Sequence, residues 1–116
     1  MMLYKLTDDY LDTNEQVATL WPCGHMEAIA IIKRGEYYFL MTSGCTGWKP
    51  NQGKYAYSKS ITGPWSELLD IANSTTFDSQ STFYCHLKET KQRVIYTLAT
   101  VGIGNNTLIL KIFSYL

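Results

Sequence analysis

The chain contains few charged residues and no excess of either sign. Of its 116 residues 17% are charged, with ten basic side chains against ten acidic ones. A balanced charge without a basic cluster removes the counterion release that supplies most of the affinity of proteins for nucleic acids. It also gives an anionic membrane surface nothing to attract. We therefore expect neither nucleic acid nor a membrane among its partners.

Long apolar runs are absent as well. The longest, Ala28–Ile32 and Tyr37–Met41, have five residues each, whereas a membrane-spanning helix needs about 20. The first residues, Met1–Leu6, lack the charged segment, apolar stretch and small-residue cleavage site of a signal peptide. The sequence alone therefore predicts no membrane span and leaves the localisation unknown.

Cysteine and histidine are scarce. Cys23, Cys45 and Cys85 are odd in number and form no CxxC pair, which argues against a disulfide framework and a zinc site. His25 and His86 are too far apart in the chain to complete a metal site with them. We predict buried free thiols, no metal site and no cofactor.

Aromatic residues are abundant instead. Nine Tyr, four Phe and three Trp accompany Thr, Ile and Val in short runs broken by Gly, Asn and Pro, a composition typical of strands. Two such runs, Ala28–Lys33 and Glu36–Thr42, predict a hairpin across Arg34-Gly35. The alternating segment Lys54–Ser58 predicts a further strand. Because no segment keeps a 3.6-residue period, we expect an all-β fold of about seven or eight strands.

A second hairpin with the same layout is predicted from Thr82–Leu87 and Arg93–Leu98, joined by Lys88–Gln92. Each hairpin follows a polar residue, Glu27 in the first case and Gln80 in the second, and these lie 53 residues apart. A repeat of about 50 residues indicates a kelch-type propeller blade. Since the innermost strands of a propeller line its central channel, we expect both side chains to meet at one pocket.

The length fits only part of such a fold. Propellers have about four to eight blades of four strands each, and this chain supplies roughly two blades. An open arc would expose the faces that neighbouring blades cover. We therefore expect that the missing blades are needed for a closed domain.

Several motifs give the chain a family resemblance. They occur in the order and at the spacing found in glycoside hydrolase family 43, and they are Leu6–Leu11, His25–Ala28, Tyr37–Trp48, Gly63–Trp65 and Asp78–Phe83. The chain resembles the branch of galactan 1,3-β-galactosidases most, over residues 3–97. The resemblance implies a five-bladed β-propeller, of which residues 1–98 form about two blades, and an oligosaccharide or polysaccharide substrate of plant type. It also implies a secreted or periplasmic protein.

Glu27 matches the general acid of the family. Glycoside hydrolysis needs a carboxylic acid that protonates the leaving oxygen and a second group that positions or activates water. Glu27 opens an apolar strand in a weakly charged stretch, where desolvation favours the protonated form of a carboxyl group. The alternative is a glutamate of an exposed loop.

The resemblance places Gln80 in the role that most of the family gives to an aspartate base. An amide does not take up a proton at neutral pH, so it orients water or acts as a rare tautomer. The alternative is a structural glutamine between blades. Asp78 is the nearest carboxylate in sequence, and its neighbours suit a loop cap equally well.

Thr46 and Trp48 fit a sugar site. An indole stacks on the apolar face of a pyranose, hydroxyl groups bind the ring hydroxyls, and loops collect such side chains. Tyr55, Tyr57 and Trp65 are interpreted as packing between strands.

The sequence departs from the family pattern in three respects. Ile29 replaces the proline that commonly follows Glu27-Ala28, which restores a backbone donor. The blades that carry the usual base are absent, so we expect no turnover from this chain alone. Residues 99–116 do not continue the family pattern.

A shifted reading frame explains that aberrant tail. If Leu98–Ile103 are encoded as TTG GCG ACC GTT GGA ATT, the neighbouring frame reads Gly-Asp-Arg-Trp-Asn, which is the family continuation. We hypothesise a frameshift, and the gene sequence tests it. The run Thr107–Phe113 favours a strand by composition alone.

Three functions stay open from the sequence, beside the alternative that the chain is the translation of a pseudogene and has no function. The first is a fragment of an exo-β-1,3-galactanase. The second is an arabinosidase or xylosidase of the same family, because pocket shape rather than the acid decides the sugar. The third is a noncatalytic carbohydrate-binding β-sandwich, whose two sheets would pack face to face.

Overall fold

The chain forms strands and no helix in the part that the computed structural model describes. That part comprises residues 1–47, 49–88, 93–103 and 107–115, with side chains described up to residue 81. No helix in these ranges can cross a membrane. The strands are β1 (Met2–Leu6), β2 (Thr13–Thr19), β3 (Met26–Arg34), β4 (Tyr37–Gly44), β5 (Lys54–Ser58), β6 (Leu69–Asp70), β7 (Gln80–Lys88), β8 (Arg93–Ile103) and β9 (Thr107–Tyr115).

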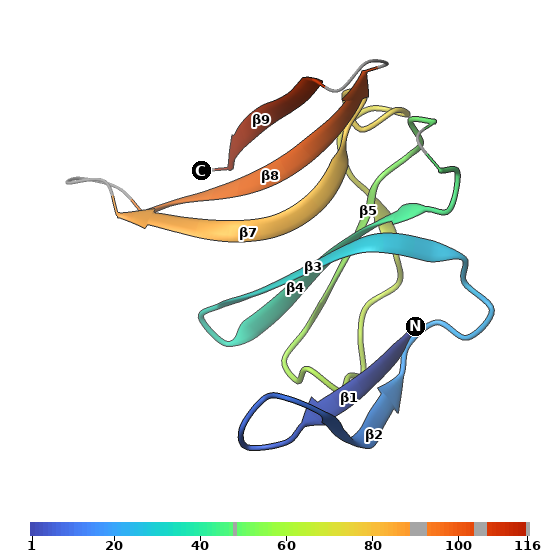
Figure 1. Cartoon of the computed structure of the whole chain (residues 1–116), viewed down its shortest axis with the longest axis vertical. Coiled ribbons are helices and arrows are strands. Elements are labelled where there is room, and N and C mark those ends of the chain that lie inside the picture. The colour runs from blue at the N-terminus through green and yellow to red at the C-terminus, as the bar shows by residue number, and fades with distance from the viewer. Residues whose placement is uncertain (48, 89–92, 104–106, 116) are drawn as a thin grey trace.

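These strands build three antiparallel sheets, which follow one another through the molecule in chain order (Figure 1). The first has the order β1-β2, the second β3-β4-β5-β6 and the third β7-β8-β9. The four-stranded sheet has the size of one propeller blade. Because the sheets are neighbours in a series, joined through the inner strands β3 and β7, the β-sandwich interpretation is wrong.

The hairpin of β3 and β4 confirms the first predicted hairpin, with its turn moved by one residue. Arg34 pairs with Tyr37, so the turn residues are Gly35 and Glu36. Gly35 has a φ of 59°, a conformation that glycine adopts without steric cost. Strand β5 has the bounds that the alternation at Lys54–Ser58 predicts.

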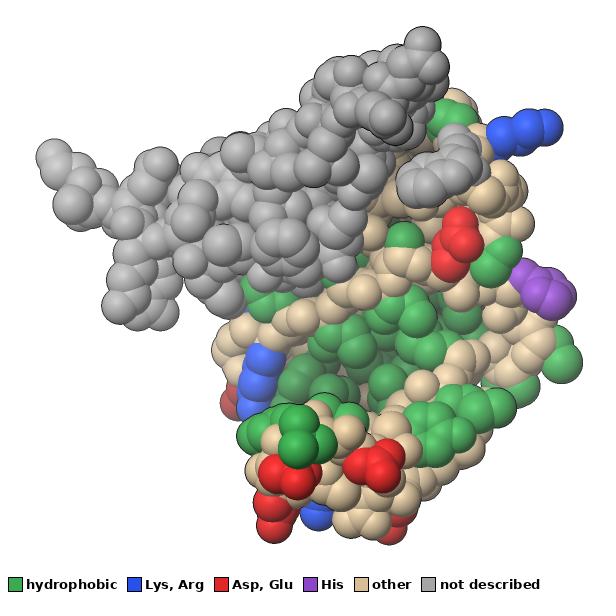
Figure 2. Space-filling model, viewed as in Figure 1, with side chains coloured by type: hydrophobic (Ala, Val, Ile, Leu, Met, Phe, Trp, Pro, Cys, Tyr) green, Lys and Arg blue, Asp and Glu red, His purple; other side chains and the backbone are tan. Residues whose placement is uncertain are grey.

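The core lies on β4 and β5 at the centre of the second sheet. Leu40 and Ala56 pair across these strands and have no exposed surface. Ile32 and Ala30 of β3 and Met41 of β4 are also buried. Apolar side chains additionally line the hollow between the first two sheets (Figure 2).

The third sheet confirms the second predicted hairpin. Strands β7 and β8 pair in antiparallel register, and their connection at 89–92 lies outside the described residues. Strand β8 continues to Ile103 and pairs with β9 over Thr107–Tyr115. The tail therefore forms a strand as its composition favours, while the domain boundary at residue 98 and the frameshift stay predictions.

The repeat of 53 residues is visible in the strand register. The pairing of β3 with β4 shifts between Glu27 and Ala30, and that of β7 with β8 shifts between Ser81 and Phe83. Strands β3 and β7 thus each carry a β-bulge within two residues of Glu27 and Gln80, respectively. The two hairpins are matching parts of adjacent sheets.

The prediction of buried thiols is wrong for two of the three cysteines. Cys23 and Cys45 are both exposed. They lie in the loops before β3 and after β4, and loops run over the protein surface. The side chain of Cys85 lies outside the described residues.

Candidate functional site

Glu27 is the second residue of β3, and its side chain is half-buried. Its backbone carbonyl accepts a hydrogen bond from the Thr42 hydroxyl at 2.8 Å. The next residue, Ala28, has a φ of 53°, which a residue with a Cβ rarely adopts. The interpretation of Glu27 as a residue of an exposed loop is therefore wrong, because it lies within a strand that forms part of the core.

Gln80, the first residue of β7, contacts Glu27 directly. The amide nitrogen Nε2 of Gln80 donates to Oε1 of Glu27 at 3.1 Å and to the backbone carbonyl of Gly47 at 3.2 Å. Two side chains that are 53 residues apart thus meet, as the repeat predicts. Gln80 also joins two sheets and a loop, which is the arrangement expected of a structural glutamine as well as of a site residue.

The contact leaves acceptor atoms available on both side chains. Among the residues with described side chains, no donor reaches the second carboxylate oxygen of Glu27 or the amide oxygen of Gln80. A protonated carboxyl group donates one hydrogen bond, and an amide oxygen accepts two. Each side chain therefore keeps one oxygen atom to which a further donor can bind.

The two groups lie closer together than the paired carboxyl groups of inverting glycosidases. In inverting enzymes the two carboxyl groups lie about 6.5–9.5 Å apart, which leaves room for a water molecule. The 3.1 Å contact between Gln80 and Glu27 leaves no such room. In this arrangement no water lies between the two polar groups.

The loop after β4 lies against this pair through Gly47. Thr46 is exposed, and its hydroxyl donates to the Lys49 carbonyl and accepts from Nδ2 of Asn51, both at 2.6 Å. Its only hydroxyl proton is thus used within the loop, which leaves an acceptor lone pair for a ligand. Trp48 lies outside the described residues.

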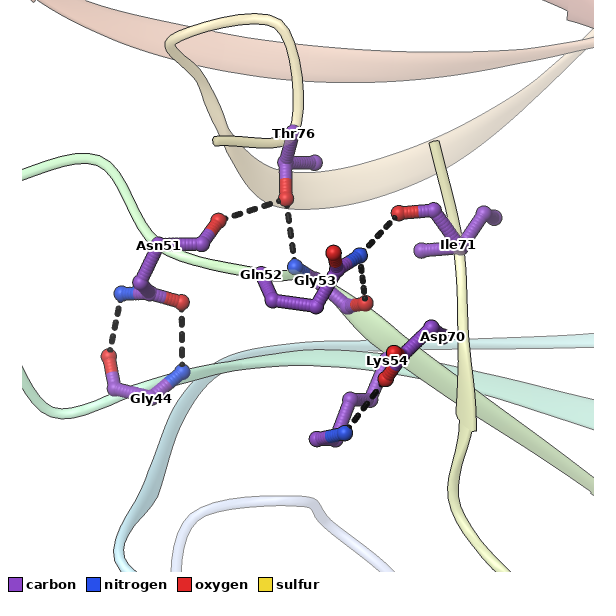
Figure 3. A network of polar contacts seen from close by, with 8 residues as sticks. All are labelled: Gly44, Asn51, Gln52, Gly53, Lys54, Asp70, Ile71 and Thr76. Atoms are coloured by element: carbon purple, nitrogen blue, oxygen red, sulfur yellow. Dashed lines mark hydrogen bonds and ion pairs between the residues drawn. The ribbon is translucent and has the colours of Figure 1, made fainter. Parts of the chain in front are cut away.

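Asn51 fixes the shape of this loop, and sequence reasoning missed it. Its side-chain amide accepts from the Gly44 nitrogen and donates to the Gly44 carbonyl, each at 2.9 Å (Figure 3). The backbone carbonyl of Asn51 accepts from the hydroxyl of buried Thr76 at 2.8 Å, and that hydroxyl also accepts from the Gly53 nitrogen (Figure 3). The turn composition around Asn51 was a detectable signal, but its partner Thr76 is 25 residues away.

The segment before Gln80 has an uncommon backbone. Thr76, Phe77 and Asp78 have φ values of 52°, 54° and 57°. The side-chain oxygen of Asn73 accepts from the backbone nitrogen of Phe77 at 2.6 Å. Asp78 is exposed, and its carboxylate has no hydrogen bond among the residues with described side chains, so Asn73 rather than Asp78 caps this turn.

No group of three or more His, Cys, Asp and Glu side chains among the described residues is arranged to hold a metal ion. The donor set around Glu27 consists of amide and hydroxyl groups, which suit a sugar hydroxyl.

Solved structures similar to this one are glycoside hydrolases. An exo-β-1,3-galactanase from Clostridium thermocellum is 44% identical with a TM-score of 0.81, over 84% of this chain and 21% of that enzyme. An exo-β-1,3-galactanase from Phanerochaete chrysosporium, solved with β-1,3-galactotriose, is 30% identical with a TM-score of 0.75, over 85% of this chain and 22% of that one. A β-1,3-galactosidase of glycoside hydrolase family 43 is 32% identical with a TM-score of 0.74, over 87% and 22%.

These matches extend over most of this chain and a small share of each enzyme. The chain spans about a fifth of the length of the galactanases that it matches. No protein-family model matches it, and no curated protein does. The structural matches confirm the predicted all-β fold of about two blades of a five-bladed propeller.

Proposed function

Because the chain belongs to glycoside hydrolase family 43, in its exo-β-1,3-galactanase branch, we propose that it carries the general acid of an enzyme that releases galactose from β-1,3-galactan. The observation that supports this most is the contact between Glu27 and Gln80. It brings a carboxyl group and a water-orienting amide together in a fold whose relatives cleave glycosidic bonds. Oligosaccharides with β-1,3-linked galactose are the proposed substrates.

Glu27 is proposed as the residue that protonates the leaving group. Its carboxyl proton passes to the glycosidic oxygen while the bond from that oxygen to the anomeric carbon breaks. Before substrate binds, the hydrogen bond from Gln80 Nε2 occupies one carboxylate oxygen, and the other oxygen carries the proton. Glu27 is then left as the carboxylate and regains its proton from solvent.

Gln80 is proposed as the residue that orients the attacking water. Its amide oxygen accepts a hydrogen bond from water, and the oxygen of that water forms the new bond to the anomeric carbon. The water must also lose a proton, which an amide does not accept at neutral pH. A base outside the described residues has to take it, and for this reason we propose that the chain is inactive without the remaining blades.

Transfer of the chain into a complete relative tests this proposal. In the chimera, the matching fifth of the Clostridium thermocellum galactanase is replaced by this chain, and galactose release from β-1,3-galactan is measured. We expect activity from the chimera and none from the 116-residue chain. Activity on arabinosyl or xylosyl substrates alone would instead favour the arabinosidase or xylosidase alternative, and a chimera that folds without any hydrolysis would contradict the proposal.

The Glu27→Gln variant of the chimera tests the acid. General acid catalysis contributes about 10²–10⁴-fold, so we expect kcat to fall by about that factor. Glu36→Gln is the matched control, because Glu36 is an exposed glutamate in the turn between β3 and β4 that contacts Lys59. Equal activity of the Glu27 variant and the control would exclude the proposed role.

A further inference from the structure

Strand β3, which carries Glu27, is irregularly paired with β4 directly after this residue. Glu27 pairs with Ser43, and the next pair is Ala30 with Met41. Two residues of β3 thus lie opposite Thr42 alone, which defines a β-bulge. Residues paired across antiparallel strands share a face of the sheet, so the bulge places Glu27 on the face of Ala30. In a regular strand, residues three apart lie on opposite faces.

The bulge needs support, because Ala28 lies in an unfavourable conformation. Its φ of 53° brings the Cβ of an L-residue close to the backbone. Asn and Asp adopt this conformation by hydrogen bonding locally, and glycine has no Cβ, but alanine has neither advantage. The surrounding residues must therefore hold the backbone in place.

Two buried hydroxyl groups hold the backbone carbonyls at the bulge. The hydroxyl of Thr42 donates to the carbonyl of Glu27 at 2.8 Å, and the hydroxyl of Ser81 donates to the carbonyl of Ala28. Thr42 is 2% exposed and Ser81 is 6% exposed. Thr42 belongs to β4 and Ser81 to β7, so the bulge is held from both neighbouring strands.

Strand β7 consequently binds both the side chain of Glu27 and the backbone next to it. Gln80 contacts the carboxylate, and the adjacent Ser81 contacts the backbone one residue beyond it. The hydrogen bonds to the backbone carbonyls of Glu27 and Ala28 hold the start of this side chain in place even when Gln80 leaves the carboxylate. Preorganisation of this kind is what a proton donor requires.

We propose that Thr42 and Ser81 are positioning residues for Glu27. They hold Ala28 at positive φ, keep the bulge in place and thereby direct the carboxyl group of Glu27 toward Gln80. This inference rests on the proposed function in so far as Glu27 is the acid. The geometry itself can be tested without any catalytic assay.

NMR spectroscopy of the labelled 116-residue chain provides two readouts. The first is the strong NOE between the amide and α protons of Ala28 that positive φ produces. The second is the NOE between the Gln80 side-chain amide protons and the γ protons of Glu27, which their contact produces. We expect Thr42→Val and Ser81→Ala to lose both signals, and Thr42→Ser to retain them because it restores the hydroxyl.

Ser43→Ala is the matched control. The Ser43 hydroxyl lies 3.5 Å from the same carbonyl that Thr42 contacts at 2.8 Å, so its removal should leave both signals unchanged. If Thr42→Val does not fold, the two signals of Ser81→Ala test the inference without it. Ser81 belongs to β7, so its replacement leaves the β3–β4 pair intact. Persistence of both signals in Ser81→Ala, or their equal loss in Ser43→Ala, would overturn the inference.

The outcome is separable from that of the proposed function. Loss of the two NMR signals in Ser81→Ala supports the positioning role even when Glu27→Gln leaves the chimera active, a result that would refute only the acid. Unchanged signals together with an inactive Glu27→Gln chimera would refute only the positioning role.

Discussion

Local hydrogen bonds lower the pKa of Asp9 in the turn between β1 and β2. The hydroxyl of Thr7 donates to its carboxylate at 2.5 Å, and the backbone nitrogen of Leu11 donates to the same oxygen at 3.2 Å. These bonds stabilise the charged form, and the Thr7 hydroxyl makes the larger contribution to lowering the pKa of Asp9 below its ordinary value of 3.8. The two bonds therefore contribute fully to the stability of the β1–β2 turn at pH values above 3.8. This contribution is lost as the pH falls through the lowered pKa of Asp9.

Replacement of Thr7 tests this assignment. In Thr7→Val the pKa of Asp9 should rise toward 3.8, because the hydroxyl that stabilises its carboxylate is gone. An NMR titration of the Asp9 carboxyl carbon measures the change. Thr19→Val is the control, since the Thr19 hydroxyl binds Gln16 and not Asp9. An unchanged Asp9 titration in Thr7→Val would contradict the assignment.

Gly53 determines the fit between two elements, the start of β5 and the segment before β7. A Cβ on Gly53 would lie 2.7 Å from the Thr76 hydroxyl oxygen and 3.0 Å from its methyl carbon. Thr76 cannot move away freely, because its hydroxyl accepts from the Gly53 nitrogen and donates to the Asn51 carbonyl. The close approach of these elements thus depends on the missing side chain.

Gly53→Ala should lower the free energy of unfolding by about 1–3 kcal/mol, the usual cost of overpacking. Chemical denaturation measures it, with Gly44→Ala as the control. A Cβ on Gly44 would meet Asn51 at 3.6 Å, an ordinary contact, so its effect should stay within about 0.5 kcal/mol. Equal stability of the two variants would show that Thr76 does not restrict Gly53.

The elements of the fold were predictable to different degrees. Apolar and aromatic alternation predicted β4 and β5, and the glycine at position 35 predicted the turn before β4. Strands β1 and β2 were missed because they are mostly exposed and carry few alternating apolar residues. An exposed strand of this kind forms because it pairs with a neighbouring strand, and its own composition does not show which segment that neighbour is.

The candidate site was predictable where it depended on the repeat. The 53-residue spacing was enough to bring Glu27 and Gln80 together, because matching positions of adjacent blades meet near one axis. The roles of Thr42, Asn51 and Ser81 were not predictable, since each depends on a bulge or a loop whose partners come from other strands. Serine, threonine and asparagine are too common for their chemistry alone to mark such positions.

The whole molecule combines a packed centre with open faces. Apolar side chains line the hollow between the first two sheets (Figure 2). Leu40 and Ala56 are completely buried, whereas Tyr37 is 37% and Tyr57 42% exposed. Neighbouring blades would cover such a face in a closed propeller. Strands β1 and β2, by contrast, form a two-stranded sheet, which is marginally stable by itself.

Hydrogen exchange should reflect this unequal packing. We expect the slowest amide exchange around Leu40 and Ala56, where burial is complete, and fast exchange throughout β1 and β2. Addition of the unmatched part of the Clostridium thermocellum enzyme should slow exchange in β1 and β2 if it covers the open face. Equal protection of β1 and β4 in the isolated chain would contradict this view of the molecule.

A crystal structure of the chimera, soaked with β-1,3-galactobiose and frozen before the disaccharide is cleaved, tests the central claim most directly. We predict that the disaccharide lies with its glycosidic oxygen at the carboxyl group of Glu27 and that the amide of Gln80 has moved from its 3.1 Å contact to the side of the attacking water. A disaccharide bound elsewhere, with Glu27 and Gln80 still in contact, would contradict the claim that these two residues form one sugar-cleaving site.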